Sequence, residues 1–315
     1  MARFLARRLG MLFASLLVAS FAIYGALYLA PGNPIAVLTG GRAVSPATVR
    51  VLEARYHLNE PFLTRYWHWL VDALHGNFGI SLINRQTVSS LISERIGTTA
   101  GLVAYTALII LVFGLSIGVL SALRPGLVDN LLVTLTSVLT ATPSFVAAIV
   151  LISVFAVKLH WLPALGDGQG FTDQVKHLTL PAIALAASSV ALVARISRAS
   201  VREELGREHV QTATSRGLSR RKILRKHVLR NAAIPIATVT GLTIASLFTL
   251  AAIVEEAFNL NGIGAALVNA AESKDFAVVQ AISLILVAAF VITNAIVDVL
   301  YAFLDPRVQL GAAAS

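Results

Sequence analysis

The stretch from Arg195 to Pro235, RISRASVREELGREHVQTATSRGLSRRKILRKHVLRNAAIP, decides how the rest of the sequence is interpreted. It holds 11 of the 25 Lys and Arg residues in a 315-residue chain that is 57% apolar, and it holds three acidic residues. Long apolar segments lie on both sides of it. Because positive charge gathers in the cytoplasmic loops of membrane proteins, residues 195–235 are predicted to form a cytoplasmic loop.

The internal pattern of this loop predicts a helix–turn–helix. Val201, Leu205 and His209 recur at helical spacing on the first helix. Gly217 then provides the positive φ that often ends a helix, and Ser219 is a suitable N-cap for a second one. By pattern alone, such a loop either docks a partner protein or serves only to set topology and hold anionic lipid.

The apolar segments outside this loop predict an all-α polytopic membrane protein. Each of six segments has at least 18 residues, above the minimum of about 17 that a transmembrane helix needs. In chain order we expect a cytoplasmic N-terminus at 1–8, a span at 9–30, an external segment with short helices at 31–97, spans at 98–123, 131–157 and 177–194, the cytoplasmic loop at 195–235, spans at 236–254 and 279–303, and a cytoplasmic tail at 304–315.

Charge counting fixes the predicted orientation. With the long first external segment set aside, the inside segments carry 16 Lys and Arg residues and the outside segments carry three. This asymmetry predicts that both termini are cytoplasmic. Within the third span, Thr142-Pro143-Ser144 predicts a kink, because proline removes a backbone hydrogen bond.

The chain carries no sequence signal for an energy source of its own. Ion-coupled carriers bury ionisable side chains in their spans, whereas here only His177 and Asp298 approach the predicted span ends. There is no G-x-x-x-x-G-K-[ST] motif to cradle ATP phosphates, and no H-E-x-x-H or G-x-S-x-G motif. We therefore expect the chain not to be an enzyme, with no catalytic residue and no cofactor of its own.

Metal and nucleic-acid binding are also disfavoured. The chain has no cysteine, and the spacings of His57, His68 and His75 match no common metal-ligand motif. Its net charge of +9 is placed at the edges of apolar spans rather than on a compact basic face. This placement indicates contact with the lipid bilayer and argues against nucleic acid.

Several motifs resemble those of one family of membrane transporters. Gln211-Thr212-Ala213, followed three residues later by Gly217, resembles the EAA-type loop of ABC-importer permeases, with Gln211 in place of the usual glutamate. The longer run QTATSRGLSRRKILRKHVLRNAAIP resembles the dipeptide/oligopeptide/nickel branch, in its first, B-type membrane subunit. PGNP (31–34), LNEPFLTRYWHWL (58–70) and GNFGISL (76–82) also resemble blocks of that branch, so the likeness covers nearly the whole chain.

This resemblance implies a type I ABC importer permease (MetI-like) fold in a bacterial or archaeal plasma membrane. It implies four kinds of partner: a second homologous permease subunit, two cytoplasmic ATP-binding subunits that hold ATP-Mg, an extracytoplasmic substrate-binding protein, and lipid. The expected contacts with the ATP-binding subunits are Val201, Leu205, Gln211, Thr212, Ala213, Gly217 and Leu218. The residues that line the translocation pathway are left unassigned.

Di- or oligopeptides are the first expected substrates of this branch, with nickel chelates or haem-like ligands as alternatives. Three functions of other classes are alternatives to an importer permease: a secondary transporter or channel, an intramembrane enzyme, and a membrane scaffold. The segment from Glu255-Glu256 to Lys274-Asp275-Phe276 also resembles the family, although Asn261 replaces the proline of its proline–glycine turn, which suggests a looser turn. An external or re-entrant loop without ligand contact is the simplest interpretation of this segment.

Overall fold

The computed structural model describes residues 2–28, 45–55, 59–81 and 83–304. Within these ranges the chain is helical, and one isolated antiparallel bridge joins Ile80 to Thr87. The prediction of an all-α membrane fold is therefore confirmed. The PGNP turn, His57 and the tail after Leu304 lie outside the described residues.

The helices alternate long apolar rods with short connecting helices. In chain order they are α1 (Ala2–Tyr28), α3 (Pro46–Arg55), α4 (Phe62–Leu74), α5 (Val88–Ile109), a π-helical segment (Ile110–Gly114), α6 (Leu115–Leu123), α7 (Leu127–Ala141), α8 (Ser144–Leu151), a second π segment (Ile152–Lys158), α9 (Phe171–Leu205), α10 (Glu208–Ser215), α11 (Arg220–Ile223), a third π segment (Leu224–Val228), α12 (Leu229–Ala257), α13 (Ile263–Glu272) and α14 (Phe276–Leu304).

Five continuous rods among the described residues are long and apolar enough to cross a membrane, and a bent pair makes a sixth candidate. The rods are Ala6–Ala26, Val88–Leu123, Phe171–Leu205, Arg220–Ala257 and Phe276–Val297, and the pair is Leu127–Ala141 with Ser144–Lys158. Several rods extend well beyond the apolar runs in the sequence. The rod Phe171–Leu205 runs on past residue 194, where the predicted span ends, because apolar residues such as Val201 continue its buried face.

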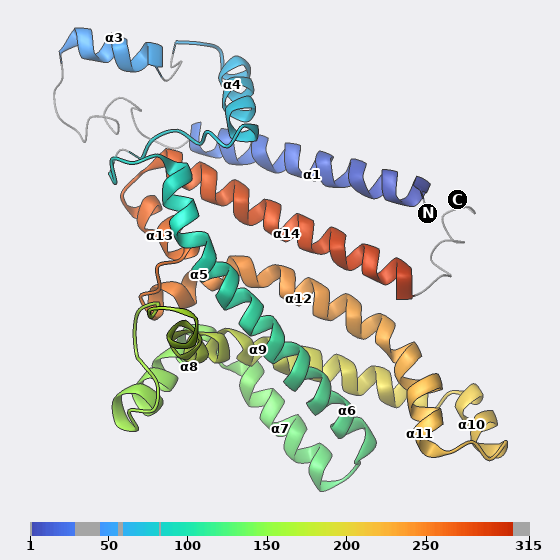
Figure 1. The fold of residues 1–315 in the computed structure, drawn as a ribbon. Coiled ribbons are helices and arrows are strands. Elements are labelled where there is room, and N and C mark those ends of the chain that lie inside the picture. The colour runs from blue at the N-terminus through green and yellow to red at the C-terminus, as the bar shows by residue number, and fades with distance from the viewer. Residues whose placement is uncertain (1, 29–44, 56–58, 82, 305–315) are drawn as a thin grey trace.

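Helix α9 is the central element of the bundle. It packs against α5, α6, α7, α8 and α12, and more than a dozen of its residues are buried. Leu180, Ala184 and Leu185 are nearly inaccessible and contribute to the largest apolar core. Helices α12 and α14 continue the layer on one side of α9, and α1 covers the far face of α14 (Figure 1).

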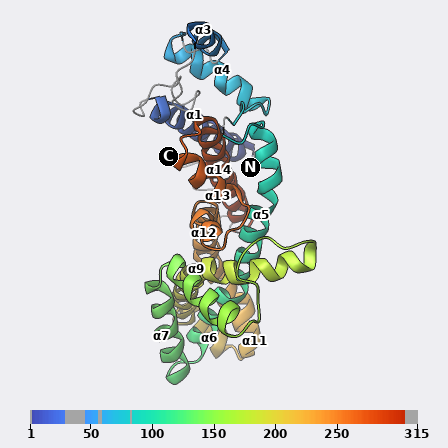
Figure 2. The same ribbon diagram turned by 90° about the vertical axis from the view of Figure 1, so that its left-hand side faces the viewer.

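The short helices gather at opposite ends of the long rods. Figure 1 shows α10 and α11 at the end where α1 begins and α14 finishes, whereas α3, α4 and α13 lie at the other end. The view along the rods in Figure 2 shows α3 and α4 beside α1, far from the α6–α7 hairpin. The short helices of the basic loop and those of the segment after α1 therefore lie at opposite ends of the rods.

The external segment is attached to α1 through aromatic side chains. Tyr66 of α4 is buried, and its hydroxyl lies 2.8 Å from Ser20 Oγ on α1. The rings of Phe21 and Tyr66 make an edge-to-face contact at 5.2 Å, a favourable geometry for aromatic pairs. Trp67, on the other side of α4, is 61% exposed.

The third span is broken rather than kinked. Helices α7 and α8 meet at an angle of 102°. Thr142 has an extended backbone (φ −90°, ψ 113°) because the residue before a proline is driven out of the helical region. Pro143 then stands just ahead of α8. The local sequence therefore accounts for the position of the break, and the tertiary packing sets its large angle.

Candidate functional site

The basic loop forms two helical segments joined by a tight turn. Helix α9 ends at Leu205, and α10 begins at Glu208 after Gly206. His209 therefore lies on α10, and the prediction that it continues the same helix as Val201 and Leu205 was wrong. The backbone N–H of Gly206 donates to Glu203 O at 3.1 Å and closes the last turn of α9.

The turn after α10 follows the sequence prediction. Gly217 has φ +75°, in the left-handed region that a side chain disfavours. Its N–H donates to Thr214 O at 2.9 Å, and the next N–H, of Leu218, donates to Ala213 O at 3.2 Å. Ser219 occupies the N-cap position of α11 as expected, although its side chain makes no capping hydrogen bond.

Helix α10 is held against the ends of the long rods by its own apolar core. Val210 and Ala213 of α10 are 6% and 5% exposed. They belong to one buried cluster whose other members are Ala122, Val201, Ile223, Val228, Ala232 and Ile236. These residues come from α6, α9, α11, the third π segment and α12, so α10 has a defined position relative to three rods.

The seven residues predicted to contact an ATP-binding subunit fall into three groups. Gln211, Thr212 and Gly217 are exposed at the surface. Leu205 and Leu218 are partly buried against the α10 core, whereas Val201 and Ala213 lie inside it. In this chain alone, the exposed group is available for a partner, and the buried group fixes the position of the exposed one.

Charges surround α10 on its solvent side. Arg207 donates from Nη2 to Glu203 Oε1 at 2.5 Å, and both side chains are more than half exposed. The exposed basic residues of the following segment are Arg220, Arg221, Lys222, Arg225, Lys226 and Arg230. The loop therefore presents a short helix flanked by positive charge.

A buried ion-pair cluster lies beneath this loop, and the sequence analysis missed it. Asp129 in the first turn of α7 is 5% exposed and is paired with Arg198 and Arg202 of α9. Sequence reasoning places Asp129 in a polar turn before the third span and both arginines in the loop. The spacing of Arg198 and Arg202 by one helical turn was the available signal, since it puts both cations on one face.

A second buried carboxylate organises the opposite end of the bundle. Glu255 is fully buried and accepts hydrogen bonds from Thr99 Oγ1 at 2.6 Å and from the N–H of Ala265 at 2.9 Å. Thr99 in turn accepts from the N–H of Ile263 at 2.9 Å. A carboxylate at the first turn of a helix satisfies N–H groups that have no intrahelical partner. Glu255 thus fixes α13 to α5 and α12.

The turn between α12 and α13 is tied by hydrogen bonds. The N–H of Asn261 donates to Asp167 Oδ1 at 2.8 Å, a bond that a proline could not make. Asp275, ahead of α14, is 3% exposed and accepts from Ser81 Oγ at 2.6 Å. In the described part of the chain, no group of three or more His, Asp or Glu residues could hold a metal ion.

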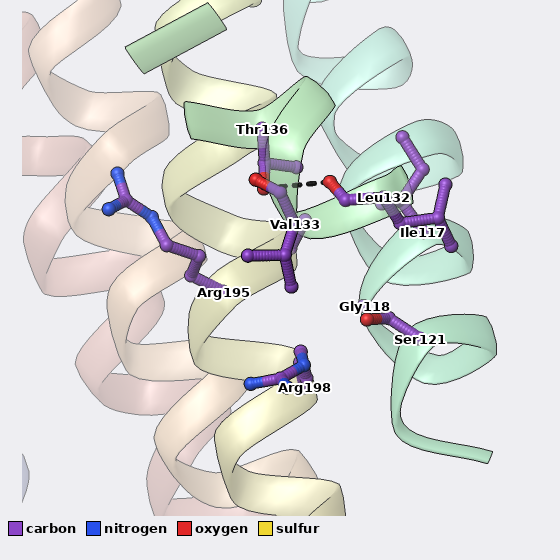
Figure 3. A pocket seen from close by; sticks show the side chains of 9 residues that line it. Ile117, Gly118, Ser121, Leu132, Val133, Thr136, Arg195 and Arg198 are labelled. Atoms are coloured by element: carbon purple, nitrogen blue, oxygen red, sulfur yellow. Dashed lines mark hydrogen bonds between the residues drawn. The ribbon is translucent and has the colours of Figure 1, made fainter. Parts of the chain in front are cut away.

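A small pocket lies between α6, α7 and α9, and its lining includes Ser121 and Arg198, which both contact Asp129. Figure 3 shows Ile117, Gly118 and Ser121 on one side of it and Arg195 and Arg198 on the other. Gly118 permits this close approach, because an added Cβ would overlap the backbone of α9.

The fold and the surface helix α10 define a helical membrane protein with an exposed basic loop, and comparisons with known proteins place it in a family. Residues 114–310 match the family described as "Binding-protein-dependent transport system inner membrane component". Residues 1–103 match the N-terminal family of the same transport-system membrane components. The chain belongs to this family of binding-protein-dependent transport permeases.

Relatives match along the full length of the chain. It is 34% identical over 310 residues to the "Probable peptide ABC transporter permease protein y4tP" of Sinorhizobium fredii, covering 97% of this chain and 99% of that one. It is 32% identical over 310 residues to the glutathione transport system permease protein GsiC of Escherichia coli, covering 98% and 99%. These matches bear out the branch named from the sequence motifs.

A solved structure supports the fold. The chain is similar to a structure described as "Inward facing conformations of the MetNI methionine ABC transporter", with a TM-score of 0.58 and 16% identity. The match covers 68% of this chain and 96% of the other. The predicted MetI-like permease fold is therefore confirmed.

Proposed function

We propose that this chain is one of two homologous membrane subunits of an ATP-driven importer for short peptides. The observation that carries the proposal is the full-length match to permeases named for peptide and glutathione transport. Glutathione is itself a modified tripeptide, so the two names share one substrate chemistry. In this proposal the chain lies in a plasma membrane with six spans and both termini cytoplasmic.

Helix α10 is the proposed contact with a cytoplasmic ATP-binding subunit. Its exposed residues Gln211 and Thr212 and the Gly217 turn stand free of the bundle, and its buried side is fixed to three rods. A short helix mounted in this way can transmit force, because interfaces and packed cores shift as units. ATP-Mg bound between two such subunits supplies the energy, and an external binding protein supplies the peptide.

The alternative of a secondary transporter has less support. The buried carboxylates Asp129, Glu255 and Asp275 lie at helix ends and are bound to arginine, hydroxyl or backbone groups within the chain. A proton relay would instead place ionisable groups along the interior of the spans.

Purification of the tagged chain from its native membrane tests the proposal. We expect a second six-span protein, cytoplasmic ATP-binding proteins and ATPase activity to be recovered with it. In vesicles made from the same cells, ATP should drive uptake of radiolabelled dialanine, and excess unlabelled glutathione or tripeptide should compete. Recovery of the chain alone, without ATPase activity, would contradict the importer assignment. Uptake of nickel chelates or haem in place of peptides would contradict the substrate class.

A further inference from the structure

Asp129 joins three helices through one carboxylate. Its Oδ1 accepts from Arg198 Nε at 2.6 Å, and its Oδ2 accepts from Arg198 Nη2 at 2.9 Å and from Arg202 Nη2 at 2.7 Å. The hydroxyl of Ser121 on α6 donates to the same Oδ1. A two-point guanidinium–carboxylate contact fixes relative orientation as well as distance. The Asp129 cluster (Ser121, Asp129, Arg198, Arg202) therefore locks the start of α7 to α6 and α9.

The cluster lies on the direct route from the loop helix into the membrane. Arg202 is three residues before the end of α9, and Val201 beside it belongs to the core that holds α10. On the α6 side, Gly118 brings the two helix backbones together one turn from Ser121. Displacement of α10 therefore carries the inner ends of α6 and α9 with it, because the parts are close-packed.

Helix α7 connects this cluster to the break in the third span. It has 15 residues, which makes it about 22 Å long. Asp129 lies in its first turn, and its last residue is followed directly by Thr142 and Pro143, where the chain turns by 102°. The α7–α8 junction has an extended backbone at Thr142 and Pro143, so no helical hydrogen-bond ladder holds α8 rigidly to α7 at this point of the route.

We propose that Asp129 is a positioning residue for transport: it makes α7 move as one body with α10, so that the movement is delivered to the Thr142–Pro143 break. This inference rests on the proposed coupling of α10 to ATP-binding subunits. It assigns a mechanical role to a buried charge that contacts neither substrate nor nucleotide. It also identifies α8 and the π segment after it as the part that changes angle relative to α7.

Distances between spin labels test this directly, and this chain itself contributes no background sites because it has no cysteine. One pair joins Leu131→Cys on α7 to Glu208→Cys on α10, and a second joins Leu131→Cys to Ile149→Cys on α8. All three positions are exposed. The purified transporter complex is measured without nucleotide and with a non-hydrolysable ATP analogue. We expect the analogue to leave the α7–α10 distance unchanged and to shift the α7–α8 distance.

Asp129→Asn should reverse which of the two distances responds to the ATP analogue. The α7–α10 distance should broaden or respond to the analogue, and the α7–α8 response should be lost. ATP-driven uptake of dialanine should fall by about 5- to 150-fold, the usual range for a coupling between sites, while ATP hydrolysis continues. Asp129→Glu retains the carboxylate and should restore both distances in part. Asp173→Asn, which removes a half-exposed carboxylate at the other end of α9, is the matched control and should behave as the unmodified chain.

If Asp129→Asn fails to accumulate, Arg202→Gln provides a milder test. It removes one of the two cations paired with Asp129, and the Arg202 side chain is 37% exposed. Unchanged distances in both variants would overturn the inference, as would a nucleotide-dependent α7–α10 distance in the unmodified chain. A purely structural role would lower thermal stability without altering either nucleotide response. If the analogue changes no distance in the unmodified complex, the proposed coupling itself fails, and this inference fails with it.

Discussion

Replacement of Thr99 by valine should destabilise the end of the bundle where α13 packs against α5 and α12. Thr99 and valine have the same shape, so the change removes a hydroxyl without opening a cavity. That hydroxyl accepts from Ile263 N–H and donates to Glu255 Oε1, at 2.9 and 2.6 Å. Its loss leaves the buried N–H of Ile263 without this partner, while Glu255 keeps its hydrogen bond from the N–H of Ala265. At about 1–3 kcal/mol for one unsatisfied group, the expected cost is about 1–3 kcal/mol.

The same helix offers a control with the opposite expected sign. Thr106 is fully buried two turns further along α5, and its Oγ1 has no hydrogen-bond partner among the described residues. Thr106→Val should therefore be neutral or should stabilise by up to about 1–3 kcal/mol, because it removes an unpaired buried hydroxyl. Thr99→Ser keeps the hydroxyl and loses one methyl, so it should cost about 1 kcal/mol.

Thermal unfolding of the detergent-purified chain measures the three variants in parallel. Hydrogen exchange then locates the effect, which should appear as lost protection of the first turn of α13. The reasoning would be refuted if Thr99→Val were as stable as the parent chain. It would also be refuted if Thr99→Val and Thr106→Val shifted the melting temperature in the same direction by the same amount.

Three further substitutions probe the loop helix and the helix contacts. Ala213→Glu places a charge in the buried face of α10, so uptake and the recovery of ATP-binding subunits with the chain should both be lost. The amount of chain in the membrane, measured by immunoblot, should stay the same. Unchanged uptake would contradict the docking role. Gly217→Pro should have the same effect on uptake, because proline cannot adopt φ +75°, whereas Gly217→Asn should be tolerated. Gly118→Val inserts a side chain against the backbone of α9 and should lower the melting temperature. Gly10→Val is the control and should lower it less, because no atom lies within 4 Å of a Cβ added at Gly10. Equal shifts would contradict the close contact of α6 and α9.

The sequence was sufficient for the fold class and for the position of the loop helix. Apolar length predicted long helices able to cross a membrane, and the turn at Gly217 followed from its residue type. The position of the bend at Pro143 was also predicted, as a kink, because proline removes a backbone hydrogen bond locally. The break of 102° was not predicted. Structural features that depend on a few residues adjacent in sequence could thus be predicted without a structure.

The partners of the buried charges could not be predicted in this way. Asp129 and its arginines are about 70 residues apart in sequence, and their pairing depends on how α7 crosses α9. Glu255 similarly meets Thr99 only because α5 and α12 are adjacent in the fold. His209 was misplaced for a different reason, since Gly206 interrupts a helical pattern that is continuous in the apolar residues. Sequence periodicity therefore gave the faces of helices without giving their partners.

Site-specific cross-linking from α10 tests the central claim most directly. Thr212→Cys places a thiol on the exposed side of α10, and Trp67→Cys places one on α4 at the opposite end of the molecule, in a chain with no other cysteine. Membranes are treated with a thiol–amine cross-linker of short reach, and the products are identified by mass spectrometry. We expect Thr212→Cys to capture a cytoplasmic ATP-binding protein and Trp67→Cys not to do so. Capture of that protein from position 67, or its absence at position 212 in a membrane that still shows ATP-driven uptake, would contradict the account.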